Sequence, residues 1–136
     1  MKARIKDQAA AGVWLYLPQA DTAVTEFVQT AAARCDAVFG SFGPESAGMR
    51  VADILSGNAQ SVETDGVIPA KPVLLMNGFN RAGLDRFLAA LREEFQTAGL
   101  PGIALKAIVT PTNRSWDFCR LAEELQREHD LMQRGR

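Results

Sequence analysis

The sequence contains few of the residues that disulfide frameworks and metal centres require. It has two cysteines, Cys35 and Cys119, and one histidine, His129. The two cysteines lie far apart within helical patterns, which is typical of reduced, partly buried thiols rather than of a disulfide framework. We therefore expect free thiols and a cytoplasmic location.

His129 has no neighbours at the spacing of metal ligands or of a catalytic pair. A metal site on a helix needs a second strong ligand one turn away on the same face, and the flanking Glu128 and Asp130 do not provide it. Cys119 and His129 are ten residues apart and do not share a helical face. The sequence thus predicts no metal, no cofactor and no nucleophile–base pair, and it favours a protein that is not an enzyme.

An excess of one charge and a long apolar run are also absent. The chain has 15 basic and 16 acidic residues and a formal net charge of -1. Lys2, Arg4 and Lys6 form a small basic cluster, but the other basic residues are mixed with acids, whereas a surface that follows phosphates needs a concentrated positive field. No stretch approaches the roughly 20 apolar residues of a membrane-spanning helix. We expect neither nucleic acid nor membrane as a partner.

The sequence does have the length and the apolar content of one globular domain. It has 136 residues, of which 47% are hydrophobic. A chain of this size buries enough surface to fold without disulfides or metals. We therefore predict a single α/β domain over residues 1–136, with halves at about 12–56 and 72–132 joined by a loop at 57–71.

Both halves are predicted to have the order strand, helix, strand, helix. In the first half the ranges are 12–17, 22–34, 37–39 and 49–55, with S-F-G-P-E-S-A-G as a turn. In the second half they are 73–76, a helix around 84–95 closed by Gly99 and Pro101, then 103–109 and 114–132. Asp21 or Thr22 is the predicted N-cap of the first helix.

The repeated order indicates a degenerate internal duplication. Val13 and Phe27 align with Val73 and Phe87 at a shift of 60 residues. Ala37 aligns with Ala107 at a shift of 70, so ten extra residues fall between the helix and the strand. Alternating strands and helices favour one four-stranded sheet with flanking helices. A ferredoxin-like α+β fold with an antiparallel sheet is the alternative, because the loop at 57–71 does not fix the direction of the third strand.

If the two halves pack side by side with parallel strands, their central strands define a switch point. The turns Pro18–Gln19 and Asn77–Asn80 would then lie together above the sheet, where doubly wound folds bind ligands.

A family resemblance begins at Lys71. The segments P-V-L-L-M-N-G-F-N-R-A-G-L-D-R-F-L, A-I-V-T-P-T-N-R-S-W and L-A-E-E-L-Q-R-E-H resemble an uncharacterised prokaryotic family that is known only as a domain of unknown function. The resemblance covers roughly Lys71 to Asp130 and rests on the strand ending in Gly-Phe, the T-x-T-N-x-x-W turn and the Glu-rich helix. It implies a small α/β domain and no activity. The first half lacks the Trp of this turn.

The turn V-T-P-T-N-R-S-W is the strongest candidate feature of the sequence. Pro111 keeps Thr110 extended, so that Thr112 or Asn113 can cap the final helix. Trp116 is expected to be largely buried against the sheet. The predicted binding residues lie at the rim of this turn and in the turn after the third strand, and they are Thr110, Asn113, Arg114, Trp116, Asn77 and Asn80.

A weaker candidate is an anion loop, which contains Gly43, Ser46, Gly48 and Arg50. The segment G-P-E-S-A-G-M-R lies between a strand and a helix, as does the phosphate loop G-x-x-x-x-G-K-[ST]. Met49 and Arg50 replace the Lys and the Ser or Thr of that loop, and Glu45 repels phosphate. An ordinary turn is therefore the competing interpretation.

The leading functional hypothesis is a small non-enzymatic module that binds a protein or self-associates. The missing catalytic groups and two amphipathic helices in the second half motivate it. The apolar stretch from Leu84 to Phe95 also suggests a homodimer. The alternative is a protein that binds a small ligand or a nucleotide with its loops at the strand ends.

Overall fold

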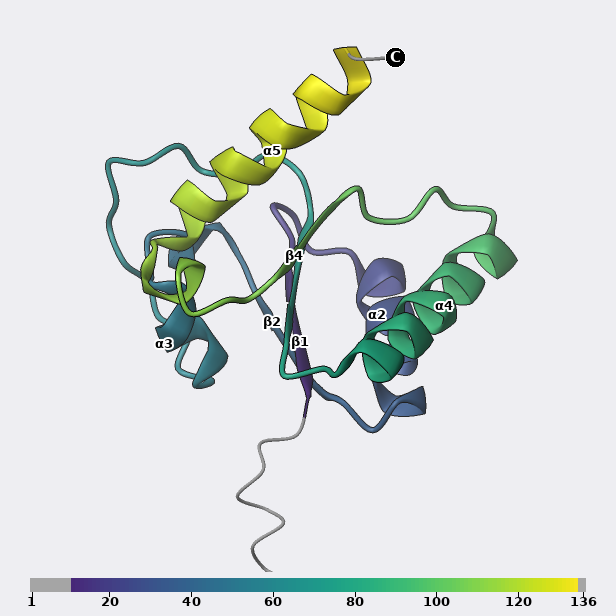
Figure 1. Ribbon diagram of the computed structural model, residues 1–136. Helices are drawn as coiled ribbons and strands as arrows, with labels where there is room; N and C mark the ends of the chain where they lie inside the picture. The colour runs from purple at the N-terminus through teal and green to yellow at the C-terminus, as the bar shows by residue number, and fades with distance from the viewer. Residues whose placement is uncertain (1–10, 135–136) are drawn as a thin grey trace, which may run out of the picture.

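The computed structural model describes residues 11–134, which form one four-stranded sheet with helices on both faces (Figure 1). The basic cluster at Lys2, Arg4 and Lys6 lies outside the described residues. The first half contains β1 (Gly12–Tyr16), α2 (Thr22–Arg34), β2 (Val38–Phe42), the 3-10 turn η1 (Pro44–Ser46) and α3 (Val51–Leu55). The second half contains β3 (Val73–Asn77), α4 (Arg81–Ala98), β4 (Leu105–Ile108), the 3-10 turn η2 (Asn113–Ser115) and α5 (Phe118–Arg134).

The strands are ordered β2-β1-β3-β4, and the sheet is mixed. β1 is parallel to β2, β3 is parallel to β4, and the central strands β1 and β3 are antiparallel. The prediction of two β-α-β-α halves in one four-stranded sheet is confirmed, and the sheet is not that of the ferredoxin-like alternative. The predicted switch point is wrong. Because the central strands are antiparallel, the turns Pro18–Gln19 and Asn77–Asn80 lie at opposite ends of the strands.

The alternation of side chains along each strand divides the core into two layers. Figure 1 shows α2 and α4 on one face of the sheet and α3 and α5 on the other. The α2/α4 layer is built on Val13, Leu15, Leu74 and Met76. The α3/α5 layer is built on Tyr16, Phe42, Val73 and Leu75. The sheet is thus covered on both faces, as its nearly continuous apolar strands require.

Two helix boundaries that the sequence predicts are confirmed. The Asp21 carboxylate accepts the backbone N–H of Val24 (3.1 Å) at the start of α2. Gly99 ends α4 in the left-handed conformation at φ 73°, which a residue without Cβ adopts at no steric cost. Both signals are local, so the sequence alone can locate them.

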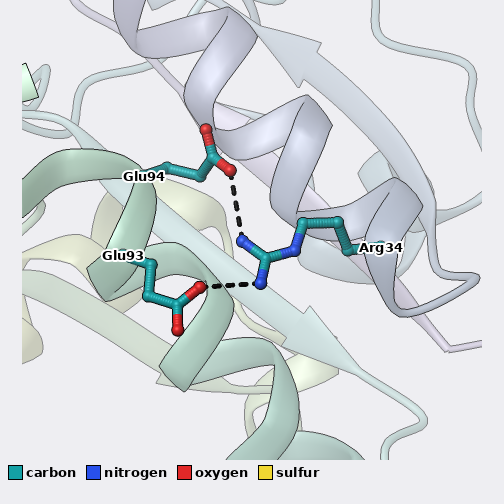
Figure 2. Close-up of polar contacts among 3 residues, drawn as sticks. All are labelled: Arg34, Glu93 and Glu94. Atoms are coloured by element: carbon teal, nitrogen blue, oxygen red, sulfur yellow. Dashed lines mark hydrogen bonds and ion pairs between the residues drawn. The ribbon is translucent and has the colours of Figure 1, made fainter. Parts of the chain in front are cut away.

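An ion pair joins the outer surfaces of α2 and α4. Figure 2 shows Arg34 between Glu93 and Glu94, at 2.7 Å from Glu93 Oε1 and 3.2 Å from Glu94 Oε2. The hydrogen bond that Arg34 donates to Glu93 is the main reason that the pKa of Arg34 is raised. Arg34 and Glu93 are exposed and Glu94 is partly buried, so these surface ion pairs contribute little to stability. The apolar residues beneath it hold the two helices together.

The residue correspondence of the two halves differs from the predicted one. The strand bounds and the two core layers equate Val13 with Leu74, not with Val73. The buried residues Val28, Ala31 and Ala32 of α2 correspond to Phe87, Ala90 and Leu91 of α4. The loop between strand and helix is shorter in the second half, so one shift cannot fit both elements. The strand registers equate Val38 of β2 with Leu105 of β4, so the second strands do not correspond at a shift of 70 either. The predicted shifts of 60 and 70 are therefore wrong, while the repeated layout holds.

The two halves are related by an approximate two-fold axis normal to the sheet. In the central pair Trp14 faces Leu75, which is also its counterpart in the other half. Above the α3/α5 face, Val51 N–H donates to the Trp116 carbonyl (2.9 Å), and Phe118 N–H donates to the Met49 carbonyl (2.8 Å). These two bonds exchange corresponding residues, so the axis passes through this contact as well.

The strand β2 is longer than the sequence predicts. β2 extends to Phe42, so the start of the predicted S-F-G-P-E-S-A-G turn belongs to the strand.

No helix within residues 11–134 is long and apolar enough to cross a membrane.

Candidate functional site

The turn from Val109 to Trp116 is held by two side chains that bond to each other's backbone. Thr110 N–H donates to Asn113 Oδ1 (2.8 Å), and Asn113 N–H donates to Thr110 Oγ1 (3.1 Å). Asn113 Nδ2 also donates to the carbonyl of Ile108 (3.2 Å). The polar atoms of both side chains are therefore engaged within the turn.

The start of α5 differs from the prediction that Thr112 or Asn113 caps the final helix. Thr112 forms no side-chain cap bond, and Asn113 opens η2. The long helix begins at Phe118, after the Asp117 carbonyl has accepted the N–H groups of Arg120 and Leu121. The capping prediction is wrong because the mutual bonds of Thr110 and Asn113 close a separate turn before the helix starts.

Trp116 is partly buried, whereas the sequence predicted that it is largely buried. Its ring packs against the α3/α5 layer of the core. The guanidinium of Arg120 lies over the ring, 4.1 Å from its centroid, in a cation–π contact. Since its ring meets the core and a cation of its own chain, packing explains this residue first.

The predicted binding residues do fall at one end of the strands, beyond the C-terminal ends of β3 and β4. β3 and β4 are parallel, so the turns that follow them leave the sheet on the same side. In the turn after β3, Asn80 Oδ1 accepts the N–H of Gly83 (2.7 Å) and caps α4. Asn77 is half-buried and Arg114 is exposed. The structure thus brings the two turns to the same end of the sheet's strands, and their role in binding stays a prediction.

The predicted anion loop folds into η1 and the turn before α3 and contains Gly43, Ser46, Gly48 and Arg50. Ser46 N–H donates to the Gly43 carbonyl (3.0 Å), and Met49 N–H donates to the Ser46 carbonyl (3.0 Å). The buried Ser46 hydroxyl donates to the carbonyl of Gln60 (2.7 Å). These donors would have to leave their partners to hold an anion, and the loop stays a prediction.

A hollow of about 670 Å³ adjoins this loop at the C-terminal ends of β1 and β2. The charged residues that line it are Asp21, Glu26 and Glu45. Carboxylates of this kind repel phosphate, so the hollow does not favour a nucleotide. Burial, and secondarily the charge of Glu45, raises the pKa of Tyr16 nearby, whose hydroxyl donates to the Pro69 carbonyl (2.7 Å).

The two cysteines are free thiols, as the sequence predicts. Cys119 is buried at the start of α5 with its Sγ 3.8 Å from Thr64 Oγ1, and Cys35 is half-buried. Within residues 11–134, no three His, Cys, Asp or Glu residues lie close enough together to hold a metal ion.

Two surfaces that the fold creates correspond to no motif in the sequence. One is the outer edge of β2, which pairs with no other strand of residues 11–134. The other is a hollow beside Arg92 on α4 and Lys106 on β4. Neither basic residue belongs to a motif, and their proximity arises from the packing of the helix against the strand.

The bonds of Asn113 lead to a test of the turn. Replacing Asn113 by Ala is expected to lower the free energy of unfolding by about 1 kcal/mol, the usual loss for such a local side-chain bond to backbone. Chemical denaturation followed by circular dichroism measures it. Thr112→Ala is the matched control and should change stability by less than about 0.5 kcal/mol. Equal losses in the two variants would contradict the role given to Asn113.

The comparisons with known proteins concern the second half. Residues 72–132 match the family model of a domain of unknown function, DUF3783. The match runs from the start of β3 into α5, so the predicted resemblance is confirmed. No curated protein and no solved structure matches the chain. The match assigns a domain and no activity.

Proposed function

We propose that the protein is a non-enzymatic α/β module that self-associates by pairing the free edge of β2 with β2 of a second copy. The observation that carries this proposal is that two residues of β2 direct their backbone N–H and C=O groups away from the sheet. Val38 N–H donates to the Ala11 carbonyl (2.8 Å), and Leu17 N–H donates to the Phe42 carbonyl (3.2 Å). Because residues alternate along a parallel edge strand, Phe39 and Ser41 direct their N–H and C=O groups away from β1.

The composition of β2 supports the same role. The strand reads V-F-G-S-F and has neither a charged residue nor a proline, which are the usual devices that protect an edge strand from pairing. Val38 is 52% exposed. The opposite edge, β4, carries Lys106 among its four residues. β2 is thus the less protected edge of the sheet.

Antiparallel pairing about Gly40 satisfies the free groups of both copies. Phe39 would exchange both backbone hydrogen bonds with Ser41 of the second copy, and Ser41 with Phe39. Val38 would face Phe42 across the pair. The indole of Trp14 lies over Gly40, where an added Cβ would be 2.9 Å from its Cδ1 and Nε1. The partly exposed ring would therefore be covered further at the junction.

The helix that first suggested a homodimer serves another purpose. Phe87, Leu91 and Phe95 of α4 are buried in the α2/α4 layer of the chain's own core. The apolar stretch from Leu84 to Phe95 is therefore used within the fold. Support for self-association comes from the sheet edge instead.

A proline in the edge strand tests the proposal. Ser41→Pro removes an N–H that makes no bond to β1, so a folded chain is expected, as for other prolines on sheet edges. The wild-type chain should sediment as a dimer at high concentration and Ser41→Pro as a monomer with an unchanged circular dichroism spectrum. The matched control is Ile108→Pro, because the neighbouring Val109 N–H makes the bond to β3 through Met76 (2.8 Å). This control should remain a dimer.

Two results would count against self-association through β2. One is a wild-type chain that stays monomeric at the highest soluble concentration. The other is equal dissociation of the Ser41→Pro and Ile108→Pro variants, which would locate the contact elsewhere or show that both prolines disturb the fold.

A further inference from the structure

A hollow of about 300 Å³ lies between α4 and the segment that leads into β4. Its apolar wall includes Leu91, Phe95 and Ile103, which are also part of the α2/α4 layer of the core. Leu100, which is 42% exposed, lies at its rim. Small-molecule sites combine apolar walls with placed polar groups, and this hollow, whose lining is both apolar and polar, has a volume at the lower end of their range.

The charged residues of this hollow are both basic. Arg92 comes from α4 and Lys106 from β4, and no Asp or Glu among residues 11–134 lines the hollow. In the described part of the chain, the ion pairs of arginine and lysine are those of Arg34 and Arg127. Arg92 and Lys106 therefore face the same hollow without a carboxylate partner.

The environment of Lys106 reflects this imbalance. Its Nζ donates to the carbonyl of Ile103 (2.7 Å), which holds the ammonium against the backbone of the segment before β4. Burial, followed by the charge of Arg92, lowers the pKa of Lys106. Both side chains also reach solvent, and an anion between two like charges offsets their repulsion.

We propose that this hollow binds a small amphipathic carboxylate. The carboxylate lies between Arg92 and Lys106, and the apolar part of the ligand covers Leu91, Phe95 and Ile103. An apolar cavity of roughly 150 Å³ already accommodates benzene, so about 300 Å³ suffices for a short aliphatic or aromatic acid. The site lies on the α4 side of the second half and is separate from the β2 edge, so it does not depend on self-association.

The test is a titration of the full chain with hexanoate, followed by the NMR shifts of backbone amides. Saturable shifts are expected at Arg92, Ile103 and Lys106. Two further probes separate the contributions of charge and of apolar surface. The neutral 1-hexanol lacks the charge, and acetate lacks the apolar chain, so each should bind at least about tenfold more weakly than hexanoate.

Variants link the binding to the two basic residues. Arg92→Gln and Lys106→Gln keep a polar side chain and should each weaken hexanoate binding by about tenfold. Arg86→Gln is the matched control, because Arg86 is exposed on α4 and does not line the hollow. Its affinity for hexanoate should equal that of the wild type. The amide spectra of all three variants show whether each is folded.

Three outcomes would overturn the proposal. The first is the absence of saturable shifts at the hollow up to tens of millimolar hexanoate. The second is equal binding of hexanoate and 1-hexanol, which would leave an apolar hollow without selectivity for an anion. The third is equal affinity of the wild type and of folded Arg92→Gln and Lys106→Gln variants.

Discussion

Replacing Phe118 by Ala is expected to lower the free energy of unfolding by about 3 to 5 kcal/mol. The side chain is fully buried in the α3/α5 layer. Its ring lies 5.0 Å from that of Tyr16 and 4.9 Å from that of Phe42, centroid to centroid. Removal of the ring loses both contacts and leaves a cavity that strands on one side and a helix on the other cannot close. Chemical denaturation monitored by circular dichroism measures the loss.

A control on the same helix isolates the effect of burial. Met132 also lies on α5 but is 66% exposed. Met132→Ala should change the free energy of unfolding by less than about 0.5 kcal/mol. Similar losses in the two variants would show that the propensity of α5, rather than the packing of Phe118, determines the result.

Replacing Phe87 by Ala is expected to have an effect of the same size, about 3 to 5 kcal/mol, in the other layer of the core. Phe87 is fully buried on α4, and its ring is stacked on that of Phe79 at 5.5 Å. It packs in the layer that joins α4 to α2 and to the sheet. The midpoint and slope of urea unfolding measure the loss.

The comparison with Arg34→Ala decides what holds α2 and α4 together. That change removes both ion pairs to Glu93 and Glu94, yet it should shift the unfolding midpoint far less than Phe87→Ala, because the ion pairs lie at the surface, where water screens them. A loss in Arg34→Ala equal to that in Phe87→Ala would contradict the dominance of apolar packing between these helices.

The sequence predicted the order of elements because the signals for it are local. Asp21 and Gly99 mark helix ends through bonds and backbone angles that depend on a few residues. The direction of β3 relative to β1 is different in kind. It depends on the path of residues 56–72, and a connection of that length can return the chain on either side of the sheet.

The turn before α5 illustrates a limit of local patterns. Thr110, Thr112, Asn113 and Asp117 are all residue types that precede helices, and the sequence does not say which of them does so here. The bonds between Thr110 and Asn113 select a 3-10 turn, which leaves Asp117 next to the helix. Competing caps within a few residues can be ranked only from the backbone geometry.

The sequence does not predict the candidate surfaces, because each depends on residues that are neighbours only in the folded chain. Among the described residues, β2 is unpaired along one side because it is the outermost strand, and its own residues do not encode that position. Arg92 and Lys106 each have the pattern of an ordinary surface residue. They line a common hollow because the side chain of Lys106 lies on the face of β4 that α4 covers.

The two-fold relation between the halves also has a consequence for how the chain holds itself together. β1 and β3 form an isologous contact, in which corresponding segments meet antiparallel as in a symmetric dimer, with Trp14 opposite its counterpart Leu75. The connector at residues 56–72 makes this association intramolecular. The effective concentration of one half near the other is therefore set by the connector and not by dilution. Cleavage within the connector would convert the fold into a complex of two fragments whose stability depends on their concentration.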